Sequence, residues 1–362
     1  MNENELRSLR FFNQQFLTSQ FSTPEALVQW FGAVQAQDYY GALWGLGLRL
    51  KHMTQTTIEK ALEERKIVRS WPMRGTLHFT PAEDLKWMLQ LLAPRITTQN
   101  VFRYRQLGLD EEVFAKAKKI LAKTLQGNKQ LSRPEIYKVF NEHGITTDDQ
   151  RGIHILGRLA REYVICFGFR HGKQQTFALF DEWIPVSNKF TKEEALAELA
   201  KRYFRSHGPA TLRDFIWWSG LTVTDARVGL ESIKNQFENA EYNNNIYWFI
   251  RPHTLPQISS EILLLPSYDE YTVAYKDRSA VLDPLHAKNN DTGNGIFHPP
   301  IVIEGQVVGL WKRVLTTKGV KVKKVAFRKF TKDEEESFTK ITKQYANFID
   351  KPLLVQSKPQ KW

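Results

Sequence analysis

Three times along the chain, a polar helix-start signal precedes apolar residues at helical spacing. The signals are Ser22-Thr23-Pro24-Glu25, Ser132-Arg133-Pro134-Glu135 and, in looser form, Thr211-Leu212-Arg213-Asp214. The first two have the form of capping boxes with a proline in the first helical turn. The apolar residues after each signal recur every three or four positions, which is typical of amphipathic helices. The pattern therefore predicts three helices of the same kind.

Each of these helices is expected within a repeated order of elements. A helical stripe precedes it, a further helix follows (residues 57–65, 150–161 and 224–235), and a β-rich stretch comes next (67–79, 164–180 and 247–250). Three helices and a β-hairpin in this order are typical of a winged helix-turn-helix. We predict a helix-rich α+β chain with three tandem winged helix-turn-helix domains, at residues 1–108, 109–186 and 187–256.

The remaining residues, 257–362, have a different pattern. Apolar stretches at 262–265 and 307–311 predict buried strands, and residues 320–327 alternate basic and apolar side chains after a Thr-Lys-Gly turn. Between residues 306 and 330 there are eight Lys or Arg and no Asp or Glu. Thr331 and Glu334 then form a capping box for a last helix. We predict a small C-terminal α+β element with a basic β-surface.

Charge and cysteine content narrow the class of protein. The chain has 362 residues, a formal net charge of +12 and a pI of about 9.5. This excess favours a polyanionic partner, because lysines and arginines that replace condensed counterions on nucleic acid release ions. Cys166 is the only cysteine, which excludes an internal disulfide and a cysteine-based zinc site. The polar, acidic start and the short apolar runs predict a cytoplasmic, bacterial-type, nucleoid-associated protein with no membrane partner.

The stretch Gln35-Ala36-Gln37-Asp38 is a candidate site at the expected end of the second helix. Residues two apart on a regular helix point about 200° apart, so the two glutamines converge only if the helix ends there. The following Tyr39-Tyr40-Gly41 is compatible with such an end. From spacing alone, a solvated helix terminus is the favoured interpretation.

At this point the chain resembles a known family. Gln35-Ala36-Gln37, followed by an aromatic and glycine-rich run, is similar to the glutamine-apolar-glutamine motif of the AlkZ-like DNA glycosylases. Residues 70–78, 264–271 and 295–300 resemble other stretches of that family, so the resemblance covers nearly the whole chain. It implies three tandem winged helices plus a C-terminal β-element around a concave DNA-binding face. It also implies base excision repair of alkylation damage in double-stranded DNA: hydrolysis of the N-glycosidic bond of N7-alkylpurines, in some members bulky adducts or crosslinks.

By this motif match Gln35 and Gln37 are the catalytic residues, with Asp38 as a competing candidate base. An N7-alkylguanine already carries positive charge and leaves readily, so catalysis needs mainly a held water and support for an oxocarbenium-like sugar. Glutamine carbonyls supply both without the desolvation cost of a carboxylate. We expect a monofunctional, metal-free and cofactor-free hydrolase. The abundant lysines leave Schiff-base chemistry open as an alternative.

Basic side chains are expected to hold the DNA. The candidates are Arg74, His78, Arg151, His154, Arg158, Lys312, Arg313, Lys321, Lys323 and Lys324. His78 could instead hydrogen-bond to the backbone of a buried strand. The helix that carries Arg151, His154 and Arg158 could instead pack against its neighbour. Tyr268, Asp269 and Glu270 either line the site or anchor the C-terminal element. The polar loop at 289–295 is either part of a hairpin that probes the duplex or a solvated connection.

Two other functions stay open at this point. A winged-helix regulator without catalysis would tolerate loss of the glutamine pair and would usually dimerise on a palindromic site, whereas three repeats in one chain can hold DNA as a monomer. A nuclease would need a convergent carboxylate metal site, which the sequence does not show clearly. The first of these is the main alternative to a glycosylase.

Overall fold

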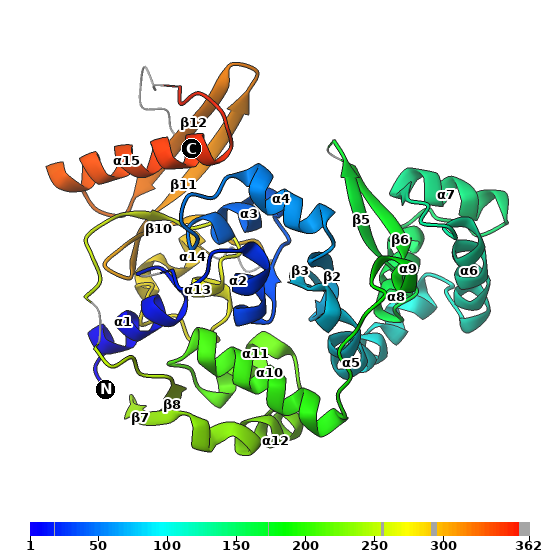
Figure 1. Ribbon diagram of the computed structural model, residues 1–362, viewed down its shortest axis with the longest axis horizontal. Coiled ribbons are helices and arrows are strands. Elements are labelled where there is room, and N and C mark those ends of the chain that lie inside the picture. The colour runs from blue at the N-terminus through cyan, green and yellow to red at the C-terminus, as the bar shows by residue number, and fades with distance from the viewer. Residues whose placement is uncertain (18, 173, 255–256, 291–294, 355–362) are drawn as a thin grey trace. The chain divides into compact units, whose positions relative to one another are not determined.

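The computed structural model describes residues 1–17, 19–172, 174–254, 257–290 and 295–354 (Figure 1). The chain divides into two compact units. Unit 1 comprises residues 1–60, 197–218 and 222–362, and unit 2 comprises residues 61–196 and 219–221. Helices α4 (Gln55–Glu63) and α10 (Lys192–His207) run across the boundaries. No helix in the described ranges is long and apolar enough to cross a membrane.

Unit 2 contains the second predicted repeat as three helices and a small sheet. Its elements are α6 (Glu111–Thr124), β4 (Leu131–Ser132), α7 (Arg133–Glu142), α8 (Arg151–Arg161), β5 (Ile165–His171) and β6 (Gln174–Leu179). Strand β6 lies between β4 and β5 and is antiparallel to both. The predicted helix at 150–161 and the predicted hairpin at 164–180 are therefore confirmed as elements. Lys173, in the turn of that hairpin, lies outside the described residues.

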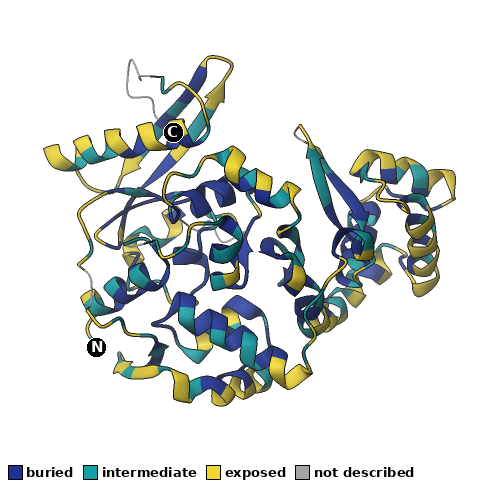
Figure 2. Ribbon diagram, in the orientation of Figure 1, coloured by how far each residue is buried: buried dark blue, intermediate teal, exposed yellow. Residues whose placement is uncertain are grey.

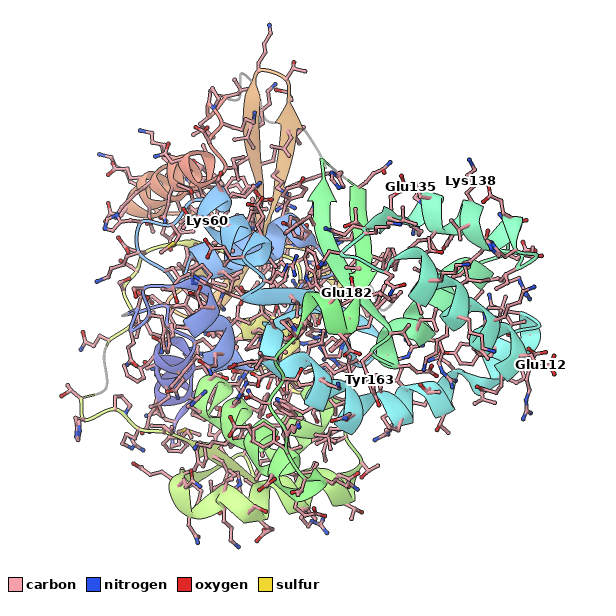
Figure 3. The ribbon with its side chains drawn as sticks, turned by 45° about the vertical axis from the view of Figure 1, so that its right-hand side comes forward. Lys60, Glu112, Glu135, Lys138, Tyr163 and Glu182 are labelled. Carbon is pink, nitrogen blue, oxygen red and sulfur yellow. The ribbon has the colours of Figure 1, made fainter. Side chains whose placement is uncertain are left out.

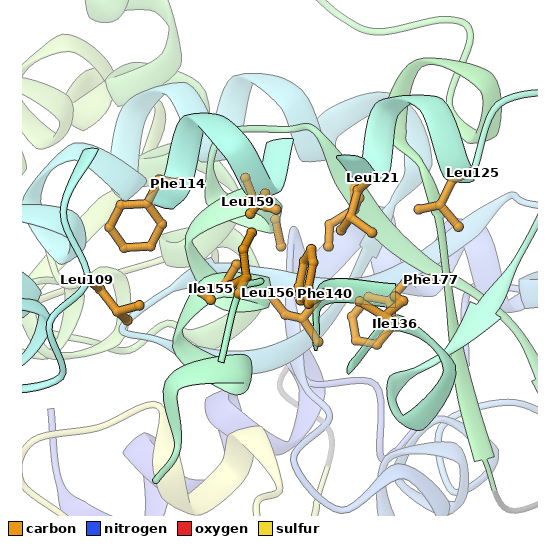
Figure 4. Packing of buried hydrophobic residues seen from close by; sticks show 14 of the residues in the cluster. Leu109, Phe114, Leu121, Leu125, Ile136, Phe140, Ile155, Leu156, Leu159 and Phe177 are labelled. Atoms are coloured by element: carbon orange, nitrogen blue, oxygen red, sulfur yellow. The ribbon is translucent and has the colours of Figure 1, made fainter. Parts of the chain in front are cut away.

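Apolar residues at helical spacing explain how these helices pack. Phe114 and Leu121 of α6, Phe140 of α7 and Leu159 of α8 are all buried in one core, with Phe177 of β6 closing it (Figure 4). Full burial of each such side chain contributes about 1.5–3 kcal/mol. Charged side chains lie on the opposite faces: Figure 3 shows Glu112 and Lys138 on the outside of α6 and α7.

The other elements of unit 2 are a hairpin and a long helix. Strands β2 (Ile67–Met73) and β3 (Thr76–Pro81) pair antiparallel around Arg74 and Gly75, which both have positive φ, as a tight hairpin turn requires. The short turn η1 (Ala82–Asp84) leads into α5 (Leu85–Gln106), and α9 (Phe180–Trp183) follows β6. The sequence pattern did not predict α5, which carries Pro94 in its interior, where a proline usually kinks or breaks a helix.

Unit 1 begins with α1 (Glu3–Asn13), α2 (Pro24–Phe31), β1 (Val34–Gln35) and α3 (Tyr39–Gly47). The N-cap of α2 is Thr23, whose side chain accepts from the Ala26 N–H. The predicted cap at Ser22 is therefore wrong by one residue, because Pro24 occupies the first helical position, where proline is tolerated. Gly32, with φ of 79°, ends the helix.

The third predicted repeat lies mostly in unit 1. After α10 come α11 (Leu212–Ser219), α12 (Val223–Ile233), the turn η2 (Lys234–Gln236), and strands β7 (Glu238–Tyr242) and β8 (Asn245–Phe249). Thr211 and Asp214 cap α11 reciprocally, and Thr222 caps α12. Strand β7 was not predicted, because its sequence Glu-Asn-Ala-Glu-Tyr is polar and largely exposed.

The C-terminal part of unit 1 is a four-stranded sheet with one long helix. The sheet order is β12 (Gly319–Ala326), β11 (Gln306–Thr316), β10 (Pro300–Ile303) and β9 (Leu263–Leu264). Between β9 and β10 lie α13 (Glu270–Val273), η3 (Pro284–His286) and α14 (Ala287–Asn290). The predicted capping box opens α15 (Lys332–Phe348). Residues 291–294 of the predicted polar loop lie outside the described residues.

Helix α3 is buried over almost its whole surface, with only Tyr40 half-buried, and it is mostly dark blue in Figure 2. Its glycines allow close approach: a Cβ atom on Gly45 would lie 3.2 Å from Pro266 and 3.3 Å from the Asp269 carboxylate. Trp44 donates from Nε1 to the Leu264 carbonyl at 2.6 Å. These contacts place the loop that follows β9 directly on α3, and therefore beside the residues that precede α3.

Candidate active site and DNA-binding surface

The Gln-Ala-Gln-Asp stretch, hereafter the motif segment (residues 35–38), does not end a helix. Helix α2 stops at Phe31, β1 includes Gln35, and Asp38 is the N-cap of α3, accepting from the Gly41 N–H at 3.1 Å. The expectation of a helix terminus is therefore wrong. Only Val34 and Gln35 lie in a strand, and Gln37 and Asp38 form a bend. The argument from helical spacing about the two glutamines therefore no longer applies.

The first residue of the motif segment is held by a buried carboxylate. The Gln35 backbone N–H donates to Glu270 Oε1 at 2.7 Å, and Glu270 is 1% exposed. The other oxygen of that carboxylate accepts from Trp218 Nε1 at 3.0 Å and lies 3.2 Å from His207 Nε2. A charge this deep is tolerated only when donors surround it. The network fixes the backbone at Gln35.

The last residue of the motif segment is held by an arginine. Both carboxylate oxygens of Asp38 lie 2.8 Å from Nη2 of Arg313 on β11. Burial lowers the pKa of Arg313, but the neighbouring Tyr345 and Asp38 raise it by more, so the net pKa shift is upward. The guanidinium therefore stays charged and keeps Asp38 in place.

The three residues that follow β9 have two different roles. Asp269 forms a buried bidentate ion pair with Arg49, at 2.7 and 2.8 Å, and Glu270 holds Gln35. Both therefore anchor the C-terminal element, which was one of the two roles expected from the sequence. Tyr268 is half-buried, and its pKa is raised by burial and by the charge of Asp38. Of the three, Tyr268 is the one beside the motif segment and partly open to solvent.

The result is a fixed segment with an exposed centre. Gln35 is buried at 8% exposure, whereas Gln37 is exposed. An exposed amide between two fixed points can hold a water or a substrate atom with little reorganisation, which is the requirement for electrostatic catalysis. In the described part of the chain, no group of three or more His, Cys, Asp or Glu could hold a metal ion.

Sequence reasoning missed the residues that hold the segment. Trp218, His207 and Arg49 were not among the candidates. Arg313 was expected to bind DNA, but in the structure it pairs with Asp38. Glu270 and Gln35 are 235 positions apart, so no local pattern connects them. The one usable signal was that Glu270 follows a predicted buried strand, and a buried acid needs hydrogen-bond donors around it.

The two candidates of the first wing lie in unit 2. His78 is 0% exposed, and its Nδ1 lies 2.9 Å from the Thr76 carbonyl. Because a carbonyl only accepts, Nδ1 carries a proton, and Nε2 faces Arg74 Nη2 at 3.4 Å. This placement favours the alternative that the sequence left open, in which His78 supports the buried strands of its own hairpin. Arg74 is half-buried in the turn.

The basic residues of α8 are engaged inside unit 2. Arg151 donates to the Thr146 carbonyl at 3.0 Å and to the carbonyls of Leu107 and Gly108. Arg158 forms ion pairs with Glu111, at 3.3 Å, and with Glu162. His154 lies edge-on to Tyr104, with ring centroids 6.0 Å apart. These side chains therefore pack against α5, α6 and the end of α8, which is the alternative role that the sequence left open.

The C-terminal hairpin divides its cations between two faces. The register pairs Lys312 with Lys323 and Val314 with Lys321, so these three lysines share one face, hereafter the basic face. The opposite face carries Arg313 and Lys324. Lys324 forms an ion pair with Glu335 of α15 and lies 4.3 Å from the Phe330 ring centroid. Arg313 and Lys324 therefore hold protein, and the basic face is the candidate surface for phosphates.

Comparison with known proteins agrees with the sequence resemblance. The model of the family described as DNA glycosylase AlkZ-like matches residues 28–348. The chain belongs to the AlkZ-like DNA glycosylase family. An interstrand DNA cross-link repair glycosylase from Streptomyces sahachiroi is 24% identical over 300 residues, covering 78% of this chain and 80% of that protein.

A solved structure shows that the fold is shared. The Streptomyces sahachiroi DNA glycosylase AlkZ matches with a TM-score of 0.80 at 21% sequence identity, covering 98% of this chain and 100% of that one. The predicted family and the mixed helix-and-sheet fold are confirmed. The division into three winged helices stays a prediction.

Proposed function

We propose that this chain hydrolyses the N-glycosidic bond of N7-alkylated purines in duplex DNA. One observation carries the proposal: the motif segment is fixed at both ends, by Glu270 at Gln35 and by Arg313 at Asp38, while Gln37 between them is exposed. Polar groups of a merely solvated loop would not need two such holders. A preorganised polar group is what a hydrolytic step on a cationic leaving group uses.

The chemistry follows from the charge of the substrate. When the C1′–N9 bond breaks, its electron pair moves onto the base and neutralises the positive charge at N7. A water oxygen bonds to C1′, and the proton that this water loses passes to solvent. Gln37 would orient that water through its carbonyl. Because Arg313 neutralises much of the Asp38 charge, we assign the orienting role to the glutamines and a supporting electrostatic role to Asp38.

The fold suggests how the DNA is held. We infer that the helix and hairpin orders α6–α7–α8–β5–β6 and α10–α11–α12–β7–β8 are winged helices, with a third copy at the N-terminus. The basic face would contact phosphates. Since the Streptomyces sahachiroi relative is named for interstrand cross-link repair, we include crosslinked purines in the proposed substrate class. We expect the chain to act as a monomer, without metal or cofactor.

The direct test is incubation of the full chain with a duplex that contains one N7-methylguanine, followed by detection of abasic sites. We expect abasic sites in the modified strand and none in the unmodified duplex. Borohydride should trap no covalent adduct, and a chelator should not change the rate. Unchanged DNA that is nevertheless bound would support the winged-helix regulator and overturn the proposal.

A further inference from the structure

Beside the motif segment, two aromatic rings and a guanidinium contact one another, and the proposed chemistry does not use them. We infer that Tyr268, Phe297 and Arg278, hereafter the stacking strip, bind a planar aromatic group of the DNA substrate. The inference rests on the proposed function and specifies which substrates the site accepts. The strip would then determine which substrates bind and would take no part in breaking the glycosidic bond.

The position of Tyr268 links the strip to the motif segment. Tyr268 follows Pro266, which lies against the start of α3: a Cβ atom on Gly41 would lie 3.1 Å from Pro266 and closer still to Asp38. Burial raises the Tyr268 pKa, and the nearby Asp38 charge raises it further, as expected for a phenol close to a carboxylate. A group stacked on this ring would therefore lie beside Asp38.

The strip is a connected series in which two rings meet edge to face and a guanidinium lies over one of them. The rings of Tyr268 and Phe297 meet at 67° with centroids 5.9 Å apart. The Arg278 guanidinium lies 4.6 Å from the Phe297 centroid and is fixed by a hydrogen bond from Nε to the Thr272 carbonyl at 2.9 Å. The series continues outward, because Trp217, 37% exposed, lies 5.9 Å from the same guanidinium.

Exposure separates this arrangement from ordinary core packing. The nearby pair Phe11 and Tyr271 has a similar edge-to-face geometry at 5.0 Å, but both of those rings are buried. Tyr268, Phe297 and Arg278 are each only half-buried. Partly exposed rings beside a guanidinium are what nucleic-acid-binding proteins use to stack flat groups and to meet phosphates.

Two parts of an alkylated duplex supply such a group. One is a nucleobase that has left the helical stack, and the other is an aromatic substituent carried on N7. Both present a flat π-surface, so the strip fits either. Substrates with and without an aromatic substituent distinguish the two sources.

The experiment compares two duplexes, one with N7-methylguanine and one with an N7-guanine adduct that carries a polycyclic aromatic substituent. Tyr268→Leu and Phe297→Leu remove a ring but keep an apolar side chain, whereas Tyr268→Phe keeps the ring. Phe102→Leu, at an exposed aromatic of unit 2, is the matched control. Thermal unfolding of each variant checks that the fold is intact.

We expect the ring-removing variants to lower kcat/KM on the aromatic adduct about tenfold or more, the range expected when a base–aromatic stack is removed. Tyr268→Phe should retain most of the kcat/KM that Tyr268→Leu loses, and Phe102→Leu should match the unchanged chain. A loss confined to the aromatic adduct assigns the substituent, and an equal loss on both duplexes assigns the base; either result supports the strip. Unchanged kcat/KM on both duplexes, or an equal loss in Phe102→Leu, would overturn the inference.

Failure of the proposed function would be recognised separately. It would appear as absence of abasic sites with the unchanged chain on both duplexes. Affinity would then decide the strip: tighter binding to the aromatic adduct than to unmodified DNA, abolished in Phe297→Leu, would support it. Equal affinity for the two would overturn it.

Discussion

The motif segment of unit 1 and helix α8 of unit 2 both carry polar side chains that the sequence marked as candidates for function. In α8 the candidate side chains themselves are occupied, since Arg151 and Arg158 end on carbonyls and carboxylates of their own unit. In the motif segment the holders take the backbone of Gln35 and the side chain of Asp38, and Gln37 stays exposed. The difference shows that a functional polar residue is recognised by how its neighbours are held as much as by its own chemistry.

The largest effect should come from the exposed centre of the motif segment. We expect Gln37→Ala, alone or with Gln35→Ala, to lower excision of N7-alkylguanine by about 10²-fold or more, the scale of losing a water-orienting group. DNA affinity should hold, because interactions with phosphates dominate it. Single-turnover excision and titration of a labelled duplex measure the two quantities.

Two further variants test whether Asp38 acts as a base or only through its ion pair with Arg313. Asp38→Asn and Arg313→Gln both break the same ion pair. If Asp38 acts through position and electrostatics, the two variants should lose similar activity. Abolished excision in Asp38→Asn, with the glutamine and Arg313 variants still active, would make Asp38 the general base and contradict our assignment.

The next effect concerns DNA affinity. Replacing Lys312, Lys321 and Lys323 by alanine should weaken binding to all sequences alike, because these lysines share the basic face. The slope of log affinity against log salt should become shallower by about 0.9 for each phosphate that the variant no longer neutralises. Fluorescence anisotropy at several salt concentrations measures it.

Matched controls exist on the same hairpin and on α8. Lys324→Ala removes one cation of that hairpin, but one that is paired with Glu335, and Arg158→Gln removes a cation paired with Glu111 and Glu162. Neither should change the salt slope. A shallower slope in Arg158→Gln would show that α8 meets DNA and would remove the contrast between the two regions.

The smallest effect tests the packed state of α8 by pH. Burial, and then the charges of Arg103 and Arg161, lower the pKa of His154 below its ordinary value of 6.5. The unfolded chain therefore binds more protons near this pH, and the folded state loses stability as the pH falls through about 6.5. His154→Gln should flatten the decline of Tm between about pH 7 and pH 5.5, by on the order of 1 °C. An unchanged decline would place His154 in solvent.

Local sequence signals predicted much of the fold but few of the residues that hold the motif segment in place. The capping boxes at Ser132 and Thr331 open helices as expected, because caps and apolar spacing act within a few residues. Helix α5 and strand β7 were missed: α5 contains an internal proline, Pro94, and β7 is polar and largely exposed. The motif was found by resemblance, but the Gln35 backbone is held by Glu270, which lies 235 positions away.

The separation between the motif and its holders has a consequence for synthesis of the chain. Residues 35–38 leave the ribosome early, whereas Glu270 and Arg313 follow in the last third of the chain. A nascent or prematurely terminated chain can carry the complete motif and, once unit 2 has folded, much of the helical body. It still lacks the carboxylate and the guanidinium that give the motif its shape. If the motif segment is catalytic, as we propose, the chain becomes competent only when translation is nearly finished, and incomplete products cannot cut bases out of DNA.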